Sequence, residues 1–384
     1  MKTFLIGVML LCFTSSPSAC EFDNVTFDNK FSTARLTACK ELASDRYLLI
    51  IKPENTPIND SAWYSFKVSS KAQSVINVTL KYTDGNQRYL PKISSDGESW
   101  EYIPFKKNRR HENKISFDLK VDKTSVWVAG QEIINNEHYI SWNEELVQKT
   151  AFKLAVLGKS EEGRNIYQLH SSSQSNEWLV IVGRMHPPEI TGALALFPFV
   201  GEFSINQELP NKFRERFNVL VIPNLNPDGV EKGNWRHNAN GVDLNRDWVT
   251  LKQRETQLVH NKLQEIEARG GKIIFAIDFH STRGNVFYTM PTDYGVFPPL
   301  LVNNWLKELD RLSKNFNVVI KPGNNPDKGV FKQYIADNYK VQAVTYEMGD
   351  NENRKIITSI AKLAAQTLMT ELLKTKKEQF LGDN

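Results

Sequence analysis

The sequence has little net charge, no internal repeat and no low-complexity tract. Its 48 Lys and Arg residues exceed its 44 Asp and Glu residues by only four, so nothing in the charge predicts a nucleic-acid partner. The apolar and charged fractions are those of a soluble globular protein. With 384 residues, the chain is long enough for two domains of ordinary size.

Long apolar runs are missing after the first twenty residues, so we expect no transmembrane segment in the rest of the chain. The exception is the N-terminus, where Lys2 precedes an apolar core at residues 4–13 and small residues at 15–19. This order is typical of a secretory signal peptide. We therefore expect residues 1–19 to be a signal peptide and the protein to be secreted or periplasmic.

Cysteine is scarce, with three in the chain, and Cys12 lies inside the expected signal peptide. The other two, Cys20 and Cys39, make an even pair in an oxidising compartment, which predicts a disulfide. A lipid anchor at Cys20 is the alternative, although Pro17 suits a lipidation site poorly.

Two parts of the chain differ in their hydrophobic pattern. From residue 20 to 136, short runs of alternating apolar and polar residues are separated by turn sequences, which predicts a small antiparallel β-sandwich. From residue 137 to 384, β-like runs alternate with helical ones, which predicts an α/β domain with a mostly parallel or mixed sheet flanked by helices. Its expected helices are residues 143–157, 190–203, 247–269, 295–315 and 354–377, and its expected strands are residues 166–170, 178–183, 217–223, 273–279, 285–290 and 341–347.

The clearest chemical motif, Arg-Met-His-Pro-Pro-Glu, follows the expected strand at 178–183. His186 and Glu189 are three residues apart in this motif, at a strand end where open α/β sheets place their ligands. Catalytic zinc is usually held by two such ligands and a third from elsewhere in the chain. His-x-x-Glu is a short pattern, however, and a surface His beside a surface Glu produces it as well.

His280 is the expected third ligand, because it follows the apolar strand 273–279 and begins a loop. Asp278 is either a partner of that histidine or a core residue, and the sequence does not separate the two. Glu347 ends the apolar strand 341–347. A carboxylate there is well placed as a general base, the alternative being a strand-end Glu in solvent.

Two Gly- and Asn-rich stretches after the strand at 217–223 carry arginines. The first ends at Arg236, and the second contains Asn245 and Arg246. Arginine offers fixed, bidentate donors that suit a carboxylate or an oxyanion, although a solvated surface charge is its usual fate.

In this order, the motifs resemble the M14 zinc metallocarboxypeptidases, with the closest likeness to the cytosolic carboxypeptidase branch of deglutamylase-like enzymes. The resemblance rests on residues 184–189, 225–230, 243–248 and 278–280. That branch also carries a β-sandwich before its catalytic domain. The resemblance implies one zinc ion per chain and hydrolysis of the last peptide bond of a peptide with a free C-terminus.

The resemblance also implies what the individual residues do. His186, Glu189 and His280 would bind zinc and leave a site for water. Glu347 would act as the general base and then as the proton donor. The free C-terminus would be required because other residues grip the terminal carboxylate.

The remaining implied roles concern the substrate. Arg236 would polarise the scissile carbonyl and hold the developing oxyanion, while Asn245 and Arg246 would grip the terminal carboxylate. Counting back from Glu347 to the position that lines the specificity pocket in the family reaches Lys332, and a shift of one residue reaches Phe331 or Gln333 instead. A cation there would favour an acidic C-terminal residue; an exposed Lys is the alternative.

One part of the family pattern is missing. Members often carry a mobile Tyr upstream of the catalytic Glu, at a spacing where this sequence has none; Tyr334 and Tyr339 are the nearest candidates. Three other functions stay open: deacylation of N-acyl amino acids, for which a narrow and closed pocket would speak, hydrolysis of peptidoglycan stem peptides, and a non-catalytic binding module.

Overall fold

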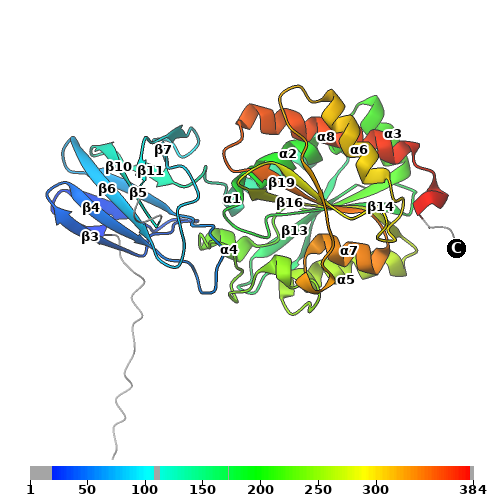
Figure 1. The fold of residues 1–384 in the computed structure, drawn as a ribbon, viewed down its shortest axis with the longest axis horizontal. Coiled ribbons are helices and arrows are strands. Elements are labelled where there is room, and N and C mark those ends of the chain that lie inside the picture. Colours follow the sequence, from blue (N-terminus) through cyan, green and yellow to red (C-terminus); the bar gives the residue numbers. More distant parts are fainter. Residues whose placement is uncertain (1–19, 108–112, 172, 381–384) are drawn as a thin grey trace, which may run out of the picture.

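The computed structural model describes residues 20–107, 113–171 and 173–380, and the signal peptide expected at residues 1–19 lies outside them. Within this part of the chain, a β-sandwich lies beside a larger α/β unit (Figure 1). The last sandwich strand, β11 (Val126–Ala129), is followed by helix α1 (Asn136–Lys149) of the α/β unit. A domain boundary between residues 136 and 137 stays a proposal.

The sandwich is built from short strands whose side chains alternate between core and solvent, as in β6, where Ile76, Val78, Leu80 and Tyr82 are buried. Besides β11, its strands are β1 (Cys20–Glu21), β2 (Val25–Asp28), β3 (Ala38–Ala43), β4 (Arg46–Ile51), β5 (Ser65–Ser70), β6 (Ser74–Tyr82), β7 (Lys92–Ser94), β8 (Glu101–Tyr102), β9 (Lys106–Lys107) and β10 (Lys114–Val121). They form one sheet in the order β1-β2-β5-β11-β7-β8 and another in the order β3-β4-β6-β10-β9. Among the strand pairs described for these two sandwich sheets, β4 and β6 are the parallel pair and the others are antiparallel.

The predicted disulfide is present. Cys20 in β1 and Cys39 in β3 are bonded, with their Cα atoms 6.0 Å apart, so the bond joins the edge strands of the two sheets. It uses the Cys20 sulfur that a lipid anchor would require.

The α/β unit is organised around an eight-stranded sheet in the order β12-β13-β15-β14-β16-β19-β17-β18. These strands are β12 (Lys153–Lys159), β13 (Asn165–His170), β14 (Glu177–Gly183), β15 (Phe217–Ile222), β16 (Lys272–Thr282), β17 (Val286–Thr289), β18 (Ile320–Pro322) and β19 (Ala343–Gly349). The four central strands, β15, β14, β16 and β19, are mutually parallel, whereas β12, β13 and β17 add antiparallel pairs. The predicted mostly parallel or mixed sheet is therefore confirmed.

Helices cover both faces of this sheet, with α2, α3, α6 and α8 on one side and α5 and α7 on the other (Figure 1). The helices are α2 (Ile190–Ser204), α3 (Glu208–Arg216), α4 (Pro227–Glu231), α5 (Arg254–Ala268), α6 (Leu301–Leu312), α7 (Phe331–Tyr339) and α8 (Arg354–Lys374), with short 3₁₀ turns η1 (Leu244–Arg246), η2 (Pro326–Lys328) and η3 (Lys377–Phe380). Central strands are buried on both faces, so β14 is apolar from Trp178 to Val182: Leu179 and Ile181 pack with α2, while Val180 and Val182 pack with α5.

Three predicted helices are wrong in part, and the one expected at 295–315 covers only Leu301–Leu312. The helix expected at 143–157 ends at Lys149, and its second half is the edge strand β12, which pairs with β13. The helix expected at 247–269 begins only at Arg254. The Asp247 carboxylate accepts hydrogen bonds from the backbone N–H groups of Lys252 and Gln253, and such local bonds compete with helix formation.

The sequence predicted no segment after residue 20 that could span a membrane, but helix α8 meets the criteria of length and composition for one. By length and composition it is apolar enough to cross a bilayer, although half of the relevant window is buried within the protein. Its apolar residues, among them Ile357, Ala361 and Leu368, belong to the same core as α2 and α6. It is therefore explained as a core helix.

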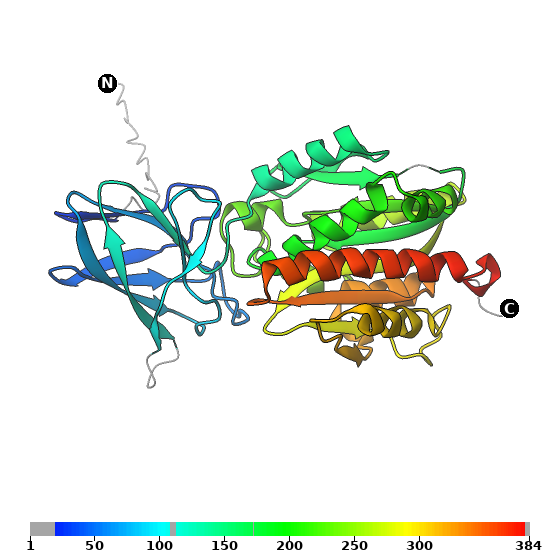
Figure 2. The same ribbon diagram turned by 90° about the horizontal axis from the view of Figure 1, so that it is seen from above.

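The sandwich and the α/β unit share a buried core. Trp235, Ile190 and Ala193 come from the α/β unit but pack into the sandwich core, and Trp235 is fully buried. The carboxyl ends of the central parallel strands point toward the sandwich (Figure 2). The edge where α/β sheets hold ligands therefore faces the junction of the two units.

Candidate active site

His186, Glu189 and His280 come together as the metal motif predicted. One ligand atom from each lies within 4.8 Å of the others, and all three side chains are buried. The Glu189 carboxylate lies between the rings, 2.8 Å from His186 Nδ1 and 2.7 Å from His280 Nδ1, and the two Nδ1 atoms are 3.2 Å apart. Two imidazole nitrogens and a carboxylate converging on one point form a donor set that suits zinc.

The outer nitrogen of each histidine is held by a carboxylate. His186 Nε2 lies 2.9 Å from Asp243 Oδ1, and His280 Nε2 lies 2.9 Å from Asp278 Oδ2. This arrangement directs both Nδ1 lone pairs inward, as metal-binding histidines require. Asp278, which the sequence left undecided, is thus a partner of His280, and its other oxygen accepts a hydrogen bond from Thr345.

The site carries an excess of buried negative charge. Burial lowers the pKa of His280, but the carboxylates of Glu189 and Asp278 outweigh this effect and raise it well above its usual value. Burial raises the pKa of Glu189, yet His186 and His280 hold it well below its usual value. The buried carboxylates of Glu189 and Asp278 favour a positive charge beside them, so the donor set fits a cation.

The chain enters the site through a constrained turn. Arg184 has a positive φ of 52°, and its buried guanidinium donates to the carbonyl oxygens of Pro187 and Ile134. Asn226, from the Asn-Pro-Asp-Gly motif, donates from its side chain to the Met185 carbonyl at 2.9 Å. Glu189 then stands at the N-cap of α2, where the helix dipole favours a carboxylate.

Glu347 lies beside the triad on β19, directly opposite His280 in the strand register. Its Oε2 atom is enclosed and has no hydrogen-bond partner among the described residues. Burial, together with the charge of Glu189, raises the pKa of Glu347 to about 8. A carboxylate with a raised pKa and an unused oxygen is suited to taking up and releasing a proton.

Arg236 is tied to the same network. Its Nε donates to Asp243 Oδ2 at 2.6 Å, and the other oxygen of Asp243 faces His186. Asp243 also caps η1 by accepting a hydrogen bond from the Asn245 backbone N–H. Sequence reasoning missed Asp243, although it lies inside the Asp-Leu-Asn-Arg motif and is the one carboxylate there.

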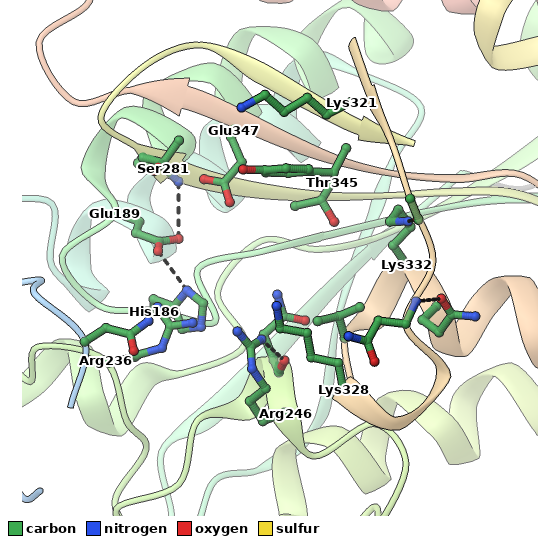
Figure 3. A pocket seen from close by; sticks show the side chains of 18 of the residues that line it. His186, Glu189, Arg236, Arg246, Ser281, Lys321, Lys328, Lys332, Thr345 and Glu347 are labelled. Carbon is green, nitrogen blue, oxygen red and sulfur yellow. Dashed lines mark hydrogen bonds and ion pairs between the residues drawn. The ribbon is translucent and has the colours of Figure 1, made fainter. Parts of the chain in front are cut away.

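Asn245 and Arg246 line the cleft from η1. Arg246 lies on the side opposite Glu347 (Figure 3). Asn245 Oδ1 accepts a hydrogen bond from the Phe331 backbone, and its Nδ2 is 3.3 Å from His280 Nε2. Since His280 Nε2 directs its proton at Asp278, it does not accept from Asn245, whose Nδ2 is left to donate to a ligand. The Arg246 side chain is exposed at the cleft.

Lys332 also lines the cleft, from the first turn of α7. It is buried rather than exposed, and its ammonium donates to the carbonyl oxygens of Thr289 at 3.1 Å and Gly323 at 2.5 Å. Burial lowers its pKa to about 8, while Asp278 and Asp337 act in the opposite direction. A positive charge is thus held in the wall of the cleft by neutral acceptors.

All eight predicted residues line one cleft of about 890 Å³ or, in the case of His280, the metal set at its base. Sequence reasoning missed the contribution of the sandwich, which supplies Asp60, Ser61 and Arg88 to the cleft wall. Arg88 makes a two-pronged ion pair with Asp350, at 2.8 and 3.0 Å, and donates to the Ser281 carbonyl. No local pattern marks these residues, because they meet the site only through the fold.

Tyr334 and Tyr339, the candidates for the mobile tyrosine, are not among the residues that line the cleft. Tyr334 packs on Trp248 and its hydroxyl is 2.7 Å from His260, and Tyr339 packs against Tyr334. Within the described part of the chain, the tyrosine that lines the cleft is Tyr288 on β17, which is partly exposed. It precedes Glu347 by a longer stretch than the family pattern suggests.

Family models match both units of the chain. The model described as zinc carboxypeptidase matches residues 139–272, and the model described as cytosolic carboxypeptidase N-terminal domain matches residues 27–130. The chain belongs to the M14 zinc carboxypeptidase family. Its His186, Glu189, Arg236, Asn245 and Arg246 fall inside the matched catalytic range, and its His-Glu-His set is compatible with the one zinc ion of the family.

Curated relatives of this M14 chain include several cytosolic carboxypeptidases. It is 24% identical to cytosolic carboxypeptidase 6 of Mus musculus over 77% of its length, and 21% identical to cytosolic carboxypeptidase 3 of Bos taurus over 84%. It spans only 62% and 37% of the lengths of these two relatives.

Solved structures share the fold of both units. A metallo-carboxypeptidase from Burkholderia cenocepacia matches with a TM-score of 0.77 at 17% identity, over 91% of this chain and 99% of that one. A metallo-carboxypeptidase from Pseudomonas aeruginosa matches with a TM-score of 0.72 at 21% identity, over 91% and 99%. These matches confirm the predicted α/β catalytic fold preceded by a β-sandwich.

The comparison contradicts the predicted location. Both the relatives and the N-terminal family model are those of cytosolic carboxypeptidases, so the expectation of a secreted or periplasmic protein was wrong. The expectation rested on residues 1–19, which lie outside the described residues. The Cys20–Cys39 bond does not depend on the predicted location, because it follows from the geometry of the two cysteines in the structure.

Proposed function

We propose that this protein is a zinc-dependent carboxypeptidase that releases single residues from the free C-terminus of a peptide, with a preference for acidic residues. The observation that carries the proposal is the convergence of the His-Glu-His set, a carboxylate with an unused oxygen and two arginines on one cleft. A metal site alone would serve many functions. The added base and anion-binding groups are what exopeptidase chemistry requires.

When bound by His186, Glu189 and His280, zinc supplies a Lewis acid that polarises a carbonyl and lowers the pKa of water. Glu347 takes the proton from the water that attacks the peptide carbon, using the oxygen that no described residue engages. It then delivers that proton to the amine that leaves. Its raised pKa, near 8, suits a group that must both gain and lose a proton near neutral pH.

The arginines and Asn245 act on the substrate. Arg236 is held through Nε by Asp243, which leaves the far end of its guanidinium to stabilise the oxyanion that develops on the scissile carbonyl. Asn245 and Arg246 bind the terminal carboxylate, and Arg246 lies opposite Glu347 (Figure 3). This clamp restricts cleavage to the last bond of a chain.

An acidic C-terminal side chain is favoured by the charges of the cleft. Lys332 keeps a positive charge in a wall where water is largely excluded, which strengthens its attraction for a carboxylate. Further cations that line the cleft are Arg88, Arg236, Arg246, Arg283, Lys321 and Lys328, against the acidic residues Asp60, Glu189 and Glu347. The size of the cleft, about 890 Å³, suits a peptide chain better than the narrow, closed pocket of a deacylase.

The test is amino-acid release from peptides that share one sequence and end in Glu, Asp, Leu or Lys. A matched set with an amidated C-terminus serves as the control for the carboxylate clamp. We expect release of single residues from the free-acid peptides, fastest for Glu and Asp, abolished by a zinc chelator and restored by added zinc. The amidated peptides should stay intact.

Three results would contradict parts of the proposal. Release of Leu or Lys as fast as Glu would remove the acidic preference and leave the carboxypeptidase. Cleavage of the amidated peptides would remove the exopeptidase assignment. No release by the zinc-loaded protein would remove the proposed function, and N-acyl amino acids and peptidoglycan stem peptides would be assayed next, with a non-catalytic binding module as the final alternative.

A further inference from the structure

Glu54, in the sandwich, binds the backbone of Arg236 and of the residues on either side of it. Glu54 accepts hydrogen bonds from three consecutive backbone N–H groups, those of Trp235 at 2.7 Å, Arg236 at 2.9 Å and His237 at 2.6 Å. Only 9% of its side chain is exposed. Hydrogen bonds from N–H groups to a buried carboxylate are short and strong, and three of them in a row fix the local course of the chain.

Other sandwich contacts hold the same loop. Asn55 places Oδ1 2.6 Å from His237 Nδ1 and donates from Nδ2 to the Gly241 carbonyl. Gly233, at a positive φ of 59°, lies so close to the sandwich that a Cβ would be 2.4 Å from the Thr33 carbonyl oxygen. The loop from residue 233 to 241 is therefore pressed against the sandwich along its length.

The side chains of the loop continue the connection into the site. Trp235 is buried in the sandwich core, so it anchors the loop on one side of Arg236. The Arg236 guanidinium in turn donates to Asp243, which also faces His186. A path of direct contacts thus runs from Glu54 through Arg236 to the metal ligands.

We propose that Glu54 is a positioning residue for Arg236, so that the sandwich forms part of the catalytic centre rather than a separate module. The inference rests on the proposed function, because it assigns Arg236 to the oxyanion. Glu54 does not touch the substrate itself; it fixes the backbone from which the guanidinium extends. A displacement of about 1 Å there is enough to weaken transition-state stabilisation.

The test compares Glu54→Gln with Glu132→Gln in the zinc-loaded, full-length protein. Glu132 is the matched control, because it also joins the sandwich to the α/β unit, by an ion pair with Arg354 at 2.7 Å, without lining the cleft. Both changes remove one interdomain charge with little change in shape. Glu54→Asp, which keeps the charge but shortens its reach, is the second variant if Glu54→Gln does not fold.

The first measurement is amide hydrogen exchange, which does not depend on activity. Glu54→Gln should speed exchange roughly tenfold in the segment 235–237 and leave α8 unchanged, whereas Glu132→Gln should leave 235–237 unchanged. Unchanged exchange at 235–237 in Glu54→Gln and Glu54→Asp would overturn the inference. Hydrogen exchange at 235–237 can be measured equally well on a protein that cleaves no peptide. Failure of this inference can therefore be distinguished from failure of the proposed function.

The second measurement is steady-state kinetics on the best peptide. We expect Glu54→Gln to lower kcat about tenfold with KM changed less than about twofold, because the lost stabilisation belongs to the transition state. In an Arg236→Ala background, the Glu54→Gln change should have no further effect, since both act through one group. Equal losses in Glu54→Gln and Glu132→Gln, or an additive loss in the double variant, would overturn the positioning role.

Discussion

Burial shifts the pKa values of Glu347 and Lys332, which line the same cleft, in opposite directions. Burial raises the pKa of the Glu347 carboxyl and lowers the pKa of the Lys332 ammonium, each to about 8, because the charged form of either group loses hydration. The two differ in their partners. Lys332 donates to two backbone carbonyls, while Glu347 keeps one oxygen without a partner among the described residues.

At the residue scale, the first prediction concerns Glu347. Glu347→Gln keeps the shape but removes the base, so kcat should fall by a factor on the order of 10²–10⁴. Bound zinc should stay at one per chain, because the metal set is His186, Glu189 and His280. Peptide release and metal analysis measure the two quantities, with Glu352→Gln, outside the cleft, as the control. Retained activity in Glu347→Gln would exclude it as the base.

The second prediction uses the pKa of Lys332. Because this pKa is lowered to about 8, the ammonium is charged below that pH and neutral above it. The ratio of kcat/KM for a Glu-ending peptide over a Leu-ending one should therefore fall as the pH rises from 7 to 9. In Lys332→Met the ratio should be low at every pH, and Lys307→Met, on the exposed side of α6, should behave as wild type. A pH-independent ratio in the wild type would refute the role of Lys332.

At the element scale, the position of His280 depends on how closely α2 packs on β16. Gly192 in α2 lies over the end of the strand, and a Cβ there would be 2.6 Å from the His280 carbonyl oxygen. Its backbone N–H donates to Ser281 Oγ at 2.7 Å. The helix that carries Glu189 at its N-cap is thus in direct contact with the strand that carries His280, another member of the proposed metal set.

The third prediction follows from this contact. Gly192→Ala should push the end of β16 away from α2 and weaken zinc binding roughly 10–100-fold. Gly201→Ala in the same helix is the matched control, since a Cβ there meets nothing within 4 Å, and it should stabilise the helix by up to about 1 kcal/mol. Zinc competition with a chromophoric chelator and thermal unfolding provide the measurements. Equal zinc affinities in the two variants would show that the contact does not set the metal site.

At the scale of the whole molecule, the two units are joined by buried charge as well as by apolar packing. The Arg88 and Asp350 side chains are 8% and 3% exposed, and they connect a sandwich loop to the segment after β19. Breaking such a pair leaves a buried charge without its partner. The junction should therefore contribute to folding, and the two units should unfold together.

The fourth prediction measures this junction. Arg88→Met should lower the free energy of unfolding by about 3–5 kcal/mol, because Asp350 loses its partner. Lys149→Met removes an ion pair whose side chains are 68% and 64% exposed, and it should cost less than about 1 kcal/mol. Urea unfolding followed by fluorescence and circular dichroism gives both values. Two separate transitions in the wild type would contradict the joint unfolding of the units.

The local patterns were sufficient for the four central strands of the α/β sheet and for most of the metal site. The apolar runs that precede His186, His280 and Glu347 identified β14, β16 and β19, whose parallel carboxyl ends meet at one sheet edge. Two of the expected strands ended too early, because β16 continues past His280 to Thr282 and β19 continues past Glu347 to Gly349. The patterns failed at residues 150–157, where pairing with β13 makes an edge strand of a segment with helical periodicity. They also left α7 unassigned, and with it the buried state of Lys332.

By itself, then, the sequence determined the donor residues, the order of the motifs and the two-part architecture, because these follow from local periodicity and from side-chain chemistry. Only the tertiary structure decided which carboxylate supports which histidine and how the sandwich enters the cleft. Glu54 lies 182 residues from Arg236, and Arg88 lies 262 residues from Asp350. Contacts at such separations depend on the packing of the whole chain, and no local pattern encodes them.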